Sequence, residues 1–173
     1  MPSIKVEVFS AVGDDLGMPK FPYIPTFLTY IMRELLKNSC KATIEQSEMN
    51  ESVVQRRPVH VVVSADVTRV AIRISDRARG IPFKVGPQIW SYLYSTSRQA
   101  GSSPSELSGY GVGLPLSRLY ARYLGGSLDL VSLPGYGTDA YLMLPRLATD
   151  LLEVVPDTRQ EYVKPPSLSS HIL

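Results

Sequence analysis

Two oxygen-bearing side chains, Glu34 and Asn38, lie four residues apart in a stretch, 26–47, that contains neither Pro nor Gly. Residues four apart share one face of a helix. At about 100° per residue, both fall within the apolar stripe marked by Ile31 and Leu35, where a charge is costly unless it is paired or faces a cleft. Such a pair could hold a ligand or a hard cation. If the helical phase is one position different, both side chains are simply solvated.

A second carboxylate, Asp76, ends a run in which Val70, Ile72 and Ile74 occupy alternate positions. Alternate residues of a strand point to one face, so Asp76 is predicted to point toward the core. A carboxylate held there could accept a hydrogen bond from an exocyclic amine such as that of adenine. The alternative is an aspartate that begins a turn and binds its own backbone.

Three glycines at alternate positions, Gly109, Gly111 and Gly113, run directly into a predicted helix that begins at Leu114. Closely spaced glycines before a helix allow backbone N–H groups to surround an anion, and phosphate is the expected one. The segment is not a Walker A loop, because no Gly-Lys-Ser/Thr follows. A flexible hinge is the alternative. Taken alone, the pair Gly137-Thr138 indicates only a turn.

Other chemistries find little support in the chain. The single cysteine, Cys40, lacks a CxxC neighbour, and neither His60 nor His171 has a partner at metal-ligand spacing, which argues against zinc sites and thiol catalysis. Among 173 residues, 18 Lys and Arg against 16 Asp and Glu leave a net charge of +2, so no broad nucleic-acid-binding face is expected. No apolar run approaches the roughly 20 residues that span a bilayer.

The elements that must position these residues follow from hydrophobic periodicity. The predicted order is a strand within 1–10, a helix over 26–47, strands at 59–65 and 70–76, a helix over 86–93, a Ser-rich loop over 95–108, a helix over 114–124, strands at 127–132 and 138–144, and a short helix over 148–154. The segment 49–58 reads as polar turns. This order predicts a two-layer α/β sandwich (α+β), with a mixed, mostly antiparallel sheet covered on one face by helices. One domain over 1–155 and a flexible tail over 156–173 are expected.

The order of these motifs and their amino-acid sequences resemble those of a known family. Five sequence segments carry the resemblance: ELLKNSCKAT at 34–43, ISDR at 74–77, YLYST at 92–96, GVGLPLSRLYARY at 111–123 and GYGTDA at 135–140. They are similar to the mitochondrial pyruvate dehydrogenase kinases and the branched-chain 2-oxoacid dehydrogenase kinase, which belong to the GHKL superfamily. The resemblance covers roughly residues 20–155.

The resemblance implies a Bergerat-type ATP-binding fold and a protein-serine kinase that uses ATP and Mg²⁺. Glu34 matches the general base, Asn38 the magnesium ligand, and Asp76 the acceptor for the adenine amine. The further residues implied at the nucleotide are Lys41, Gly80, Ser95, Thr96, Gly109, Tyr110, Gly111, Val112, Gly113, Leu114 and Thr138.

The same resemblance implies partners and a location. The protein substrate would be the E1 subunit of a 2-oxoacid dehydrogenase, pyruvate dehydrogenase first, and the location the mitochondrial matrix. The resemblance further implies binding to the E2 lipoyl domain through an N-terminal helical domain, which is expected to be absent from this chain, and formation of homodimers. Alternatives are an ATP-binding module without kinase activity, the branched-chain dehydrogenase as substrate, and a bacterial-type sensor kinase.

The chain departs from the family pattern at two places near these motifs. Ala78 and Arg79 stand where the family usually has glycines, which is expected to weaken ATP binding by a clash or, at a positive φ, by backbone strain. Tyr30, four residues before Glu34, replaces the His of the pyruvate dehydrogenase kinases and matches the Tyr of the branched-chain enzyme. The substrate assignment therefore stays open between the two dehydrogenases.

Overall fold

The structure is a computed structural model that describes residues 1–11, 22–48, 50–94 and 111–146. Its elements are β1 (Ile4–Ser10), α1 (Pro25–Gln46), α2 (Glu51–Gln55), β2 (Val59–Ala65), β3 (Arg69–Asp76), the 3₁₀ helix η1 (Gly86–Trp90), α4 (Gly113–Tyr123), β4 (Ser127–Leu133) and β5 (Gly137–Pro145). Four predicted site residues, Ser95, Thr96, Gly109 and Tyr110, lie outside the described residues. So do the short helix predicted over 148–154 and the tail.

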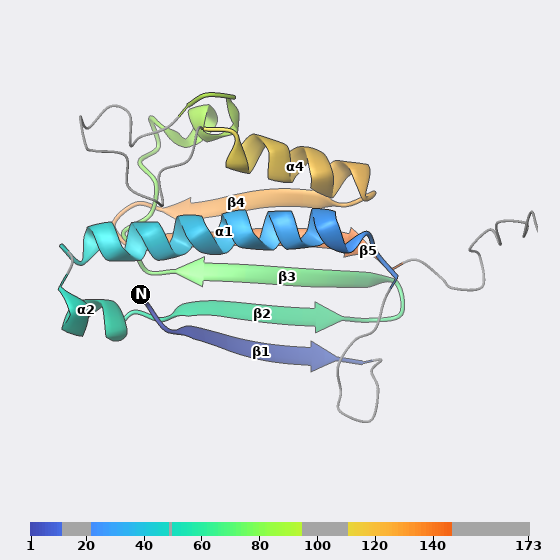
Figure 1. Cartoon of the computed structure of the whole chain (residues 1–173), viewed down its shortest axis with the longest axis horizontal. Coiled ribbons are helices and arrows are strands. Elements are labelled where there is room, and N and C mark those ends of the chain that lie inside the picture. Colours follow the sequence, from blue (N-terminus) through green and yellow to red (C-terminus); the bar gives the residue numbers. More distant parts are fainter. Residues whose placement is uncertain (12–21, 49, 95–110, 147–173) are drawn as a thin grey trace, which may run out of the picture.

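The five strands form one sheet in the order β1-β2-β3-β5-β4 (Figure 1). β1 pairs with β2 in parallel, and the three other pairs are antiparallel. A mixed, mostly antiparallel sheet was predicted from the element order, and this prediction is confirmed. The two predicted hairpins, β2–β3 and β4–β5, meet at the centre of the sheet, where β3 pairs with β5.

Helices α1 and α4 lie side by side over one face of the sheet (Figure 1). Ile31 and Leu35 of α1 are buried there against residues such as Ile74 and Leu142. Between the helices, the ring of Phe27 stacks on that of Tyr120 with centroids 4.5 Å apart. The core therefore lies between one helical layer and one face of the sheet, as the two-layer prediction requires.

The buried stripe of α1 differs in part from the predicted one. Ala42, which continues the apolar spacing of Ile31 and Leu35, is only half-buried, whereas Ser39, Cys40 and Thr43 are buried. Thr43 donates a hydrogen bond from its hydroxyl to the backbone oxygen of Ser39, 2.8 Å away. A small hydroxyl can pack in an apolar layer when the helix backbone accepts its proton, and periodicity of apolar residues alone does not reveal such positions.

Two short elements were not predicted correctly. The segment 49–58, expected to be turns, contains α2, whose cap Asn50 accepts hydrogen bonds from the N–H groups of Ser52 and Val53. The predicted helix over 86–93 is instead a single 3₁₀ turn that ends at Trp90, and Leu93 has a φ of +65°. A chain with left-handed backbone at that position cannot continue a right-handed helix.

Within the described ranges, no helix combines the length and the apolar character needed to cross a bilayer.

Candidate functional site

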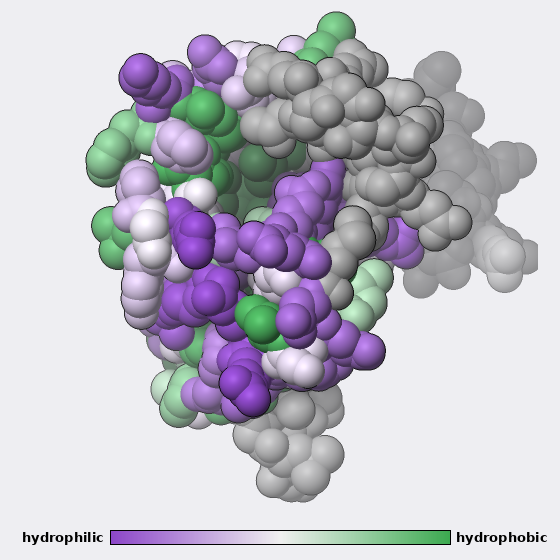
Figure 2. All heavy atoms as spheres, turned by 90° about the vertical axis from the view of Figure 1, so that its left-hand side faces the viewer, coloured by the Kyte–Doolittle hydropathy of each residue, from purple (hydrophilic) through white to green (hydrophobic). Residues whose placement is uncertain are grey.

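Three elements bring the predicted site residues to one region: the middle of α1, the end of β3 and the start of α4. β3 ends at the left-hand side of Figure 1, and hydrophilic side chains gather on that side of the molecule (Figure 2). α1 packs against both α4 and β3. Motifs far apart in the sequence therefore come together in the helical layer and the end of β3 beneath it.

Asp76, the last residue of β3, is buried on the helix side of the sheet with 5% of its surface exposed. Its Oδ1 accepts hydrogen bonds from the backbone N–H groups of Ala78, at 3.1 Å, and Thr138, at 3.3 Å. The Ser39 side chain of α1 donates a further hydrogen bond to the carboxylate. Since a carboxylate has about four acceptor positions, three donors leave capacity for one more, such as an exocyclic amine.

Burial raises the pKa of Asp76, and the hydrogen bonds from Ala78, Ser39 and Thr138 oppose that rise. A carboxylate that loses solvation in the folded state is destabilised in its charged form. Perturbed carboxyl groups of this kind are found more often at functional sites than elsewhere. Asp76 therefore has the burial and the spare acceptor capacity of a ligand-binding residue.

Glu34 lies on α1 directly beside the first residue of α4. A Cβ placed on Gly113 would overlap Glu34 Oε2, so the carboxylate reaches that helix start only because residue 113 is glycine. Both oxygens of Glu34 also accept hydrogen bonds from Lys37 Nζ at 3.2 Å. The Glu34 side chain retains 15% exposure, which leaves it accessible from the site.

Two further predicted residues of α1, Asn38 and Lys41, are half-buried. Asn38 lies on α1 one turn after Glu34 and next to Ser39, the residue that contacts Asp76. Lys41 Nζ forms an ion pair with Glu45 at 3.7 Å.

The described part of the glycine segment forms a tight crossing with the chain before the Ser-rich loop. Gly111 has a φ of +76°, its carbonyl accepts a hydrogen bond from Leu93 N at 2.9 Å, and a Cβ there would lie 2.6 Å from Tyr94 O. α4 then begins without a side-chain cap at Val112 and without an acidic residue in its first turn. The uncapped N–H groups of Gly113 and Leu114 suit an anion.

The other edge of the site is the turn after β3, packed on the β4–β5 hairpin. Gly80 has a φ of +68°, and a Cβ there would overlap Leu133 O. Thr138 Oγ1 lies 3.0 Å from Ser132 Oγ, which accepts a hydrogen bond from Ile81 N at 2.6 Å. This network fixes the backbone that surrounds Asp76.

Ser39 and Ser132 are site residues that the sequence analysis missed. Ser39 donates to Asp76, and Ser132 links Thr138 to the turn after β3. The only signal for Ser39 is its position four residues after Leu35, which puts a small polar residue on the predicted stripe. Ser132 carries no signal of its own, because its role depends on a contact between segments 51 residues apart.

The departure from glycine in this turn strains Arg79 rather than Ala78. Arg79 has a φ of +61°, whereas Ala78 is not among the residues with positive φ. Of the two residues at which weaker ATP binding was expected, only Arg79 therefore has the positive φ that causes backbone strain. Tyr30 packs edge-on against Tyr120, with ring centroids 5.3 Å apart, and its pKa is raised by burial and then by the charge of Glu34.

The residues present fit an adenine nucleotide in three respects. Among the described residues, Asp76 has a spare acceptor position, close backbone approaches depend on Gly80 and Gly111, and α4 begins beside Glu34 without a side-chain cap. The described residues contain no group of three or more His, Cys, Asp or Glu side chains that could hold a metal. A magnesium ion here would take most of its ligands from phosphate and water, which is its usual preference.

Comparisons with known proteins identify the family of the chain. Residues 23–148 match the family model described as histidine kinase-, DNA gyrase B-, and HSP90-like ATPase. The chain is 43% identical over 145 residues to a mitochondrial pyruvate dehydrogenase (acetyl-transferring) kinase of Arabidopsis thaliana, covering 79% of this chain and 39% of the relative. It is 40% identical over 159 residues to one of Ascaris suum, covering 90% and 38%. It is 38% identical over 151 residues to isozyme 4 of Homo sapiens, covering 86% and 36%. The chain thus spans less than two fifths of the length of these three relatives.

Proposed function

Because the chain belongs to the histidine kinase-, DNA gyrase B- and HSP90-like ATPase family, we propose that it is the ATP-binding catalytic region of a protein-serine kinase. The proposed substrate is the E1 subunit of a 2-oxoacid dehydrogenase, pyruvate dehydrogenase first. Three relatives at 38–43% identity, each named as a pyruvate dehydrogenase kinase, support this choice.

One observation carries the proposal: Glu34 lies against the start of α4, and Asp76 is buried beneath the helices at the end of β3. A phosphate bound at the helix start would lie beside a carboxylate able to accept a proton. An adenine at Asp76 would lie toward the other end of the layer. The proposed base, phosphate site and adenine acceptor belong to three different elements, and the contacts of α1 with α4 and β3 support this arrangement.

The residues have distinct roles in the proposed reaction. Asp76 would accept a hydrogen bond from the adenine amine, with Gly80 and Thr138 around it, and Asn38 would hold Mg²⁺. The N–H groups at the start of α4 would stabilise charge on the phosphates, where most of the catalysis of phosphoryl transfer lies. ATP supplies the transferable γ-phosphoryl group.

Glu34 would act as the general base. It would accept the hydroxyl proton of the acceptor serine as that oxygen attacks phosphorus. Lys37, which donates to both carboxylate oxygens, holds the Glu34 side chain in one orientation and balances its charge. Lys41, Ser95, Thr96, Gly109 and Tyr110 are proposed to complete the nucleotide site.

The wider context of the kinase belongs to the same proposal. The three relatives reported above carry "mitochondrial" in their names, and we place this chain in the mitochondrial matrix. Binding to an E2 lipoyl domain through a separate N-terminal domain, and formation of a homodimer, are the partners we propose. The branched-chain dehydrogenase is the second candidate substrate, since Tyr30 stands where that kinase has Tyr.

A second candidate function is an ATP-binding module that transfers no phosphoryl group. The observation that favours it is Arg79, a non-glycine residue at φ +61° in the turn beside Asp76. Strain there would weaken nucleotide binding without removing the residues that make it. Phosphoryl transfer to a protein substrate separates this candidate from the kinase.

The test compares Glu34→Gln with the parent chain, using MgATP labelled at the γ-phosphate and purified pyruvate dehydrogenase E1. We expect the parent to label serine in E1 and the variant to lose about 10²-fold or more of the rate, because a general base contributes about 10²–10⁴-fold. The affinity for MgATP, measured by calorimetry, should change less than about threefold, since Gln keeps the size of the side chain.

Glu7→Gln is the matched control, because it makes the same change on the exposed strand β1. It should label E1 at the parent rate. If Glu34→Gln also transfers at the parent rate, Glu34 is not the base. If the parent binds MgATP but labels neither E1 nor the branched-chain dehydrogenase, the binding module is the correct function.

A further inference from the structure

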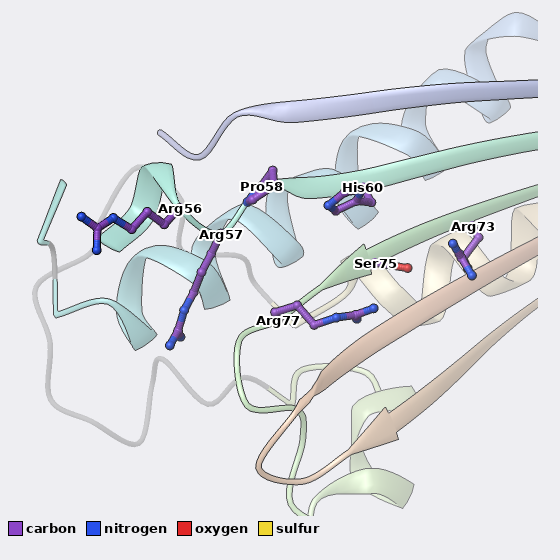
Figure 3. A pocket seen from close by; sticks show the side chains of 7 residues that line it. All are labelled: Arg56, Arg57, Pro58, His60, Arg73, Ser75 and Arg77. Carbon is purple, nitrogen blue, oxygen red and sulfur yellow. The ribbon is translucent and has the colours of Figure 1, made fainter. Parts of the chain in front are cut away.

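A second hollow lies on the face of the sheet that α1 and α4 leave uncovered. Residues of β3 alternate between the faces, so Arg73 and Ser75 point away from the helices, while Ile74 and Asp76 point toward them. The pocket there has a volume of about 430 Å³. Its lining comes from the end of α2, the start of β2 and the second half of β3 (Figure 3): Arg56, Arg57, Pro58, His60, Arg73, Ser75 and Arg77.

The lining is strongly cationic: four of its seven residues are arginine, one is histidine, and none is acidic. Of the four arginines, Arg77 alone pairs with a carboxylate in the part of the chain that the structure describes, with Nη1 3.3 Å from Asp139 Oδ1. Like charges brought together in this way repel one another. An anion in the pocket would relieve that repulsion.

A buried hydroxyl provides an independent indication of a ligand. Ser75 is 2% exposed, and its Oγ has no hydrogen-bond partner among the described residues. Buried polar atoms without partners are rare in folded proteins, and each calls for an explanation. In the view of Figure 3, the Ser75 oxygen lies between the guanidinium groups of Arg73 and Arg77. A bound group with acceptor oxygens would give this hydroxyl its partner.

We propose that this pocket binds the phosphate groups of a small phosphorylated molecule. The planar guanidinium groups of Arg73 and Arg77 suit paired hydrogen bonds to phosphate oxygens, and the Ser75 hydroxyl would donate a third. Arg57 and His60 face the same space. The volume falls within the range of about 300–1,000 Å³ usual for small-molecule sites.

The site is separate from the nucleotide site of the proposed function. Ser75 and Asp76 are consecutive residues of one strand and point to opposite faces of the sheet. The proposal therefore does not depend on kinase activity. A phosphate bound by Arg77 would compete with Asp139 of β5 for the Arg77 guanidinium.

The test is titration of the chain with inorganic pyrophosphate, without Mg²⁺ and at constant ionic strength. We expect binding by the parent chain, a loss of affinity of about tenfold or more in Arg73→Ala, and a smaller loss in Ser75→Ala. Arg69→Ala is the matched control, because Arg69 lies on the same strand and the same face but does not line the pocket. Its affinity should stay within about twofold of the parent.

Amide chemical shifts then locate the bound probe. The proposal expects the largest changes at His60, Ser75 and Arg77. It is overturned if pyrophosphate does not bind, if Arg69→Ala loses as much affinity as Arg73→Ala, or if the changes centre on Gly111 and Gly113. Equal binding of citrate with the same dependence on Arg73 would contradict the phosphate assignment.

Sedimentation tests the competing occupant, a second copy of the chain. If the parent self-associates, Arg73→Ala abolishes the association and pyrophosphate has no effect on it, the pocket serves an interface and the proposal fails. If the parent chain is monomeric in sedimentation and still binds pyrophosphate with the affinity measured by titration, the proposal stands.

Discussion

At the scale of single residues, Asp76 shows how two alternative interpretations can both hold. The sequence allowed either a core-facing carboxylate or an aspartate that binds its own turn. In the structure, Asp76 is 5% exposed and also accepts a hydrogen bond from the backbone N–H of Ala78, two residues later. The hydrogen bond from Ala78 holds the carboxylate in place, and burial raises its pKa, as is common at ligand-binding sites. Its parity in the strand was predictable, but its donor Ser39 was not.

Asp76→Asn tests the energetic cost of this carboxylate. Burial raises the pKa of Asp76 above the ordinary 3.8, so the folded state holds the proton more tightly than the unfolded state. The free energy of unfolding should therefore fall as pH rises from about 4 through the raised pKa. Asn carries no charge and keeps an acceptor oxygen, so the variant should lose this part of the fall. Urea unfolding between pH 3 and pH 8 measures both chains.

Asp76→Asn should change MgATP binding as well as the pH dependence of unfolding. Asp76→Asn should equal or exceed the parent in stability at pH 7 and bind MgATP more weakly, since a neutral amide is a poorer acceptor for the adenine amine. A parent and a variant with the same pH dependence of unfolding would show that burial of Asp76 costs nothing.

Arg79 is the residue at which the turn stores strain. At φ +61°, a residue with a Cβ costs about 1 kcal/mol or more relative to glycine. Arg79→Gly should raise the free energy of unfolding by about 1 kcal/mol and improve MgATP affinity if the strain reaches the site. Thermal and urea unfolding measure the first effect, and calorimetry measures the second.

Ala78→Gly is the control for that change, because Ala78 does not have a positive φ. There the added flexibility should lower stability by about 0.5–1 kcal/mol. A gain in stability at residue 78 and none at residue 79 would reverse the assignment of strain.

At the scale of elements, the site depends on how α1 approaches the start of α4. Gly113 leaves room for the Glu34 carboxylate, and the aromatic rings of Phe27 and Tyr120 hold the helices together. Gly113→Ala should therefore displace Glu34 and lower phosphoryl transfer at least about tenfold, since small misplacements of a catalytic group are costly. Stability should change by no more than about 1 kcal/mol, because Ala favours helix and the flexible carboxylate can move.

Gly86→Ala makes the same change in η1, where the added methyl group meets nothing within 4 Å. It should keep the parent rate of transfer. If Gly113→Ala and Gly86→Ala have equal activity, the contact between Glu34 and the start of α4 has no role in catalysis.

The elements differ in how well sequence pattern predicts them. The strands and the two long helices have long apolar periods, and all were placed within a few residues of their observed bounds. α2 is five residues long, and η1 begins next to Pro87, so neither has enough length for a period to show. Short elements are set by caps and turns, which depend on individual backbone angles rather than on repeated spacing.

At the scale of the whole molecule, the sheet separates two surfaces. Its helix side carries Asp76 and Glu34, and its other side carries the arginine pocket around Ser75. The first surface was predictable because the order and the amino-acid sequences of its motifs resemble those of a known kinase family. The second was not, since Arg57, His60 and Arg73 come together only when β2 pairs with β3.

Titration of the chain with MgATP, with MgGTP as the comparison, tests the central claim most directly. The account predicts micromolar, magnesium-dependent binding of MgATP that Asp76→Ala abolishes, and little binding of MgGTP, whose guanine presents an acceptor where adenine presents an amine. Binding of both nucleotides with equal affinity, or unchanged affinity for MgATP in Asp76→Ala, would contradict the claim that this carboxylate recognises adenine.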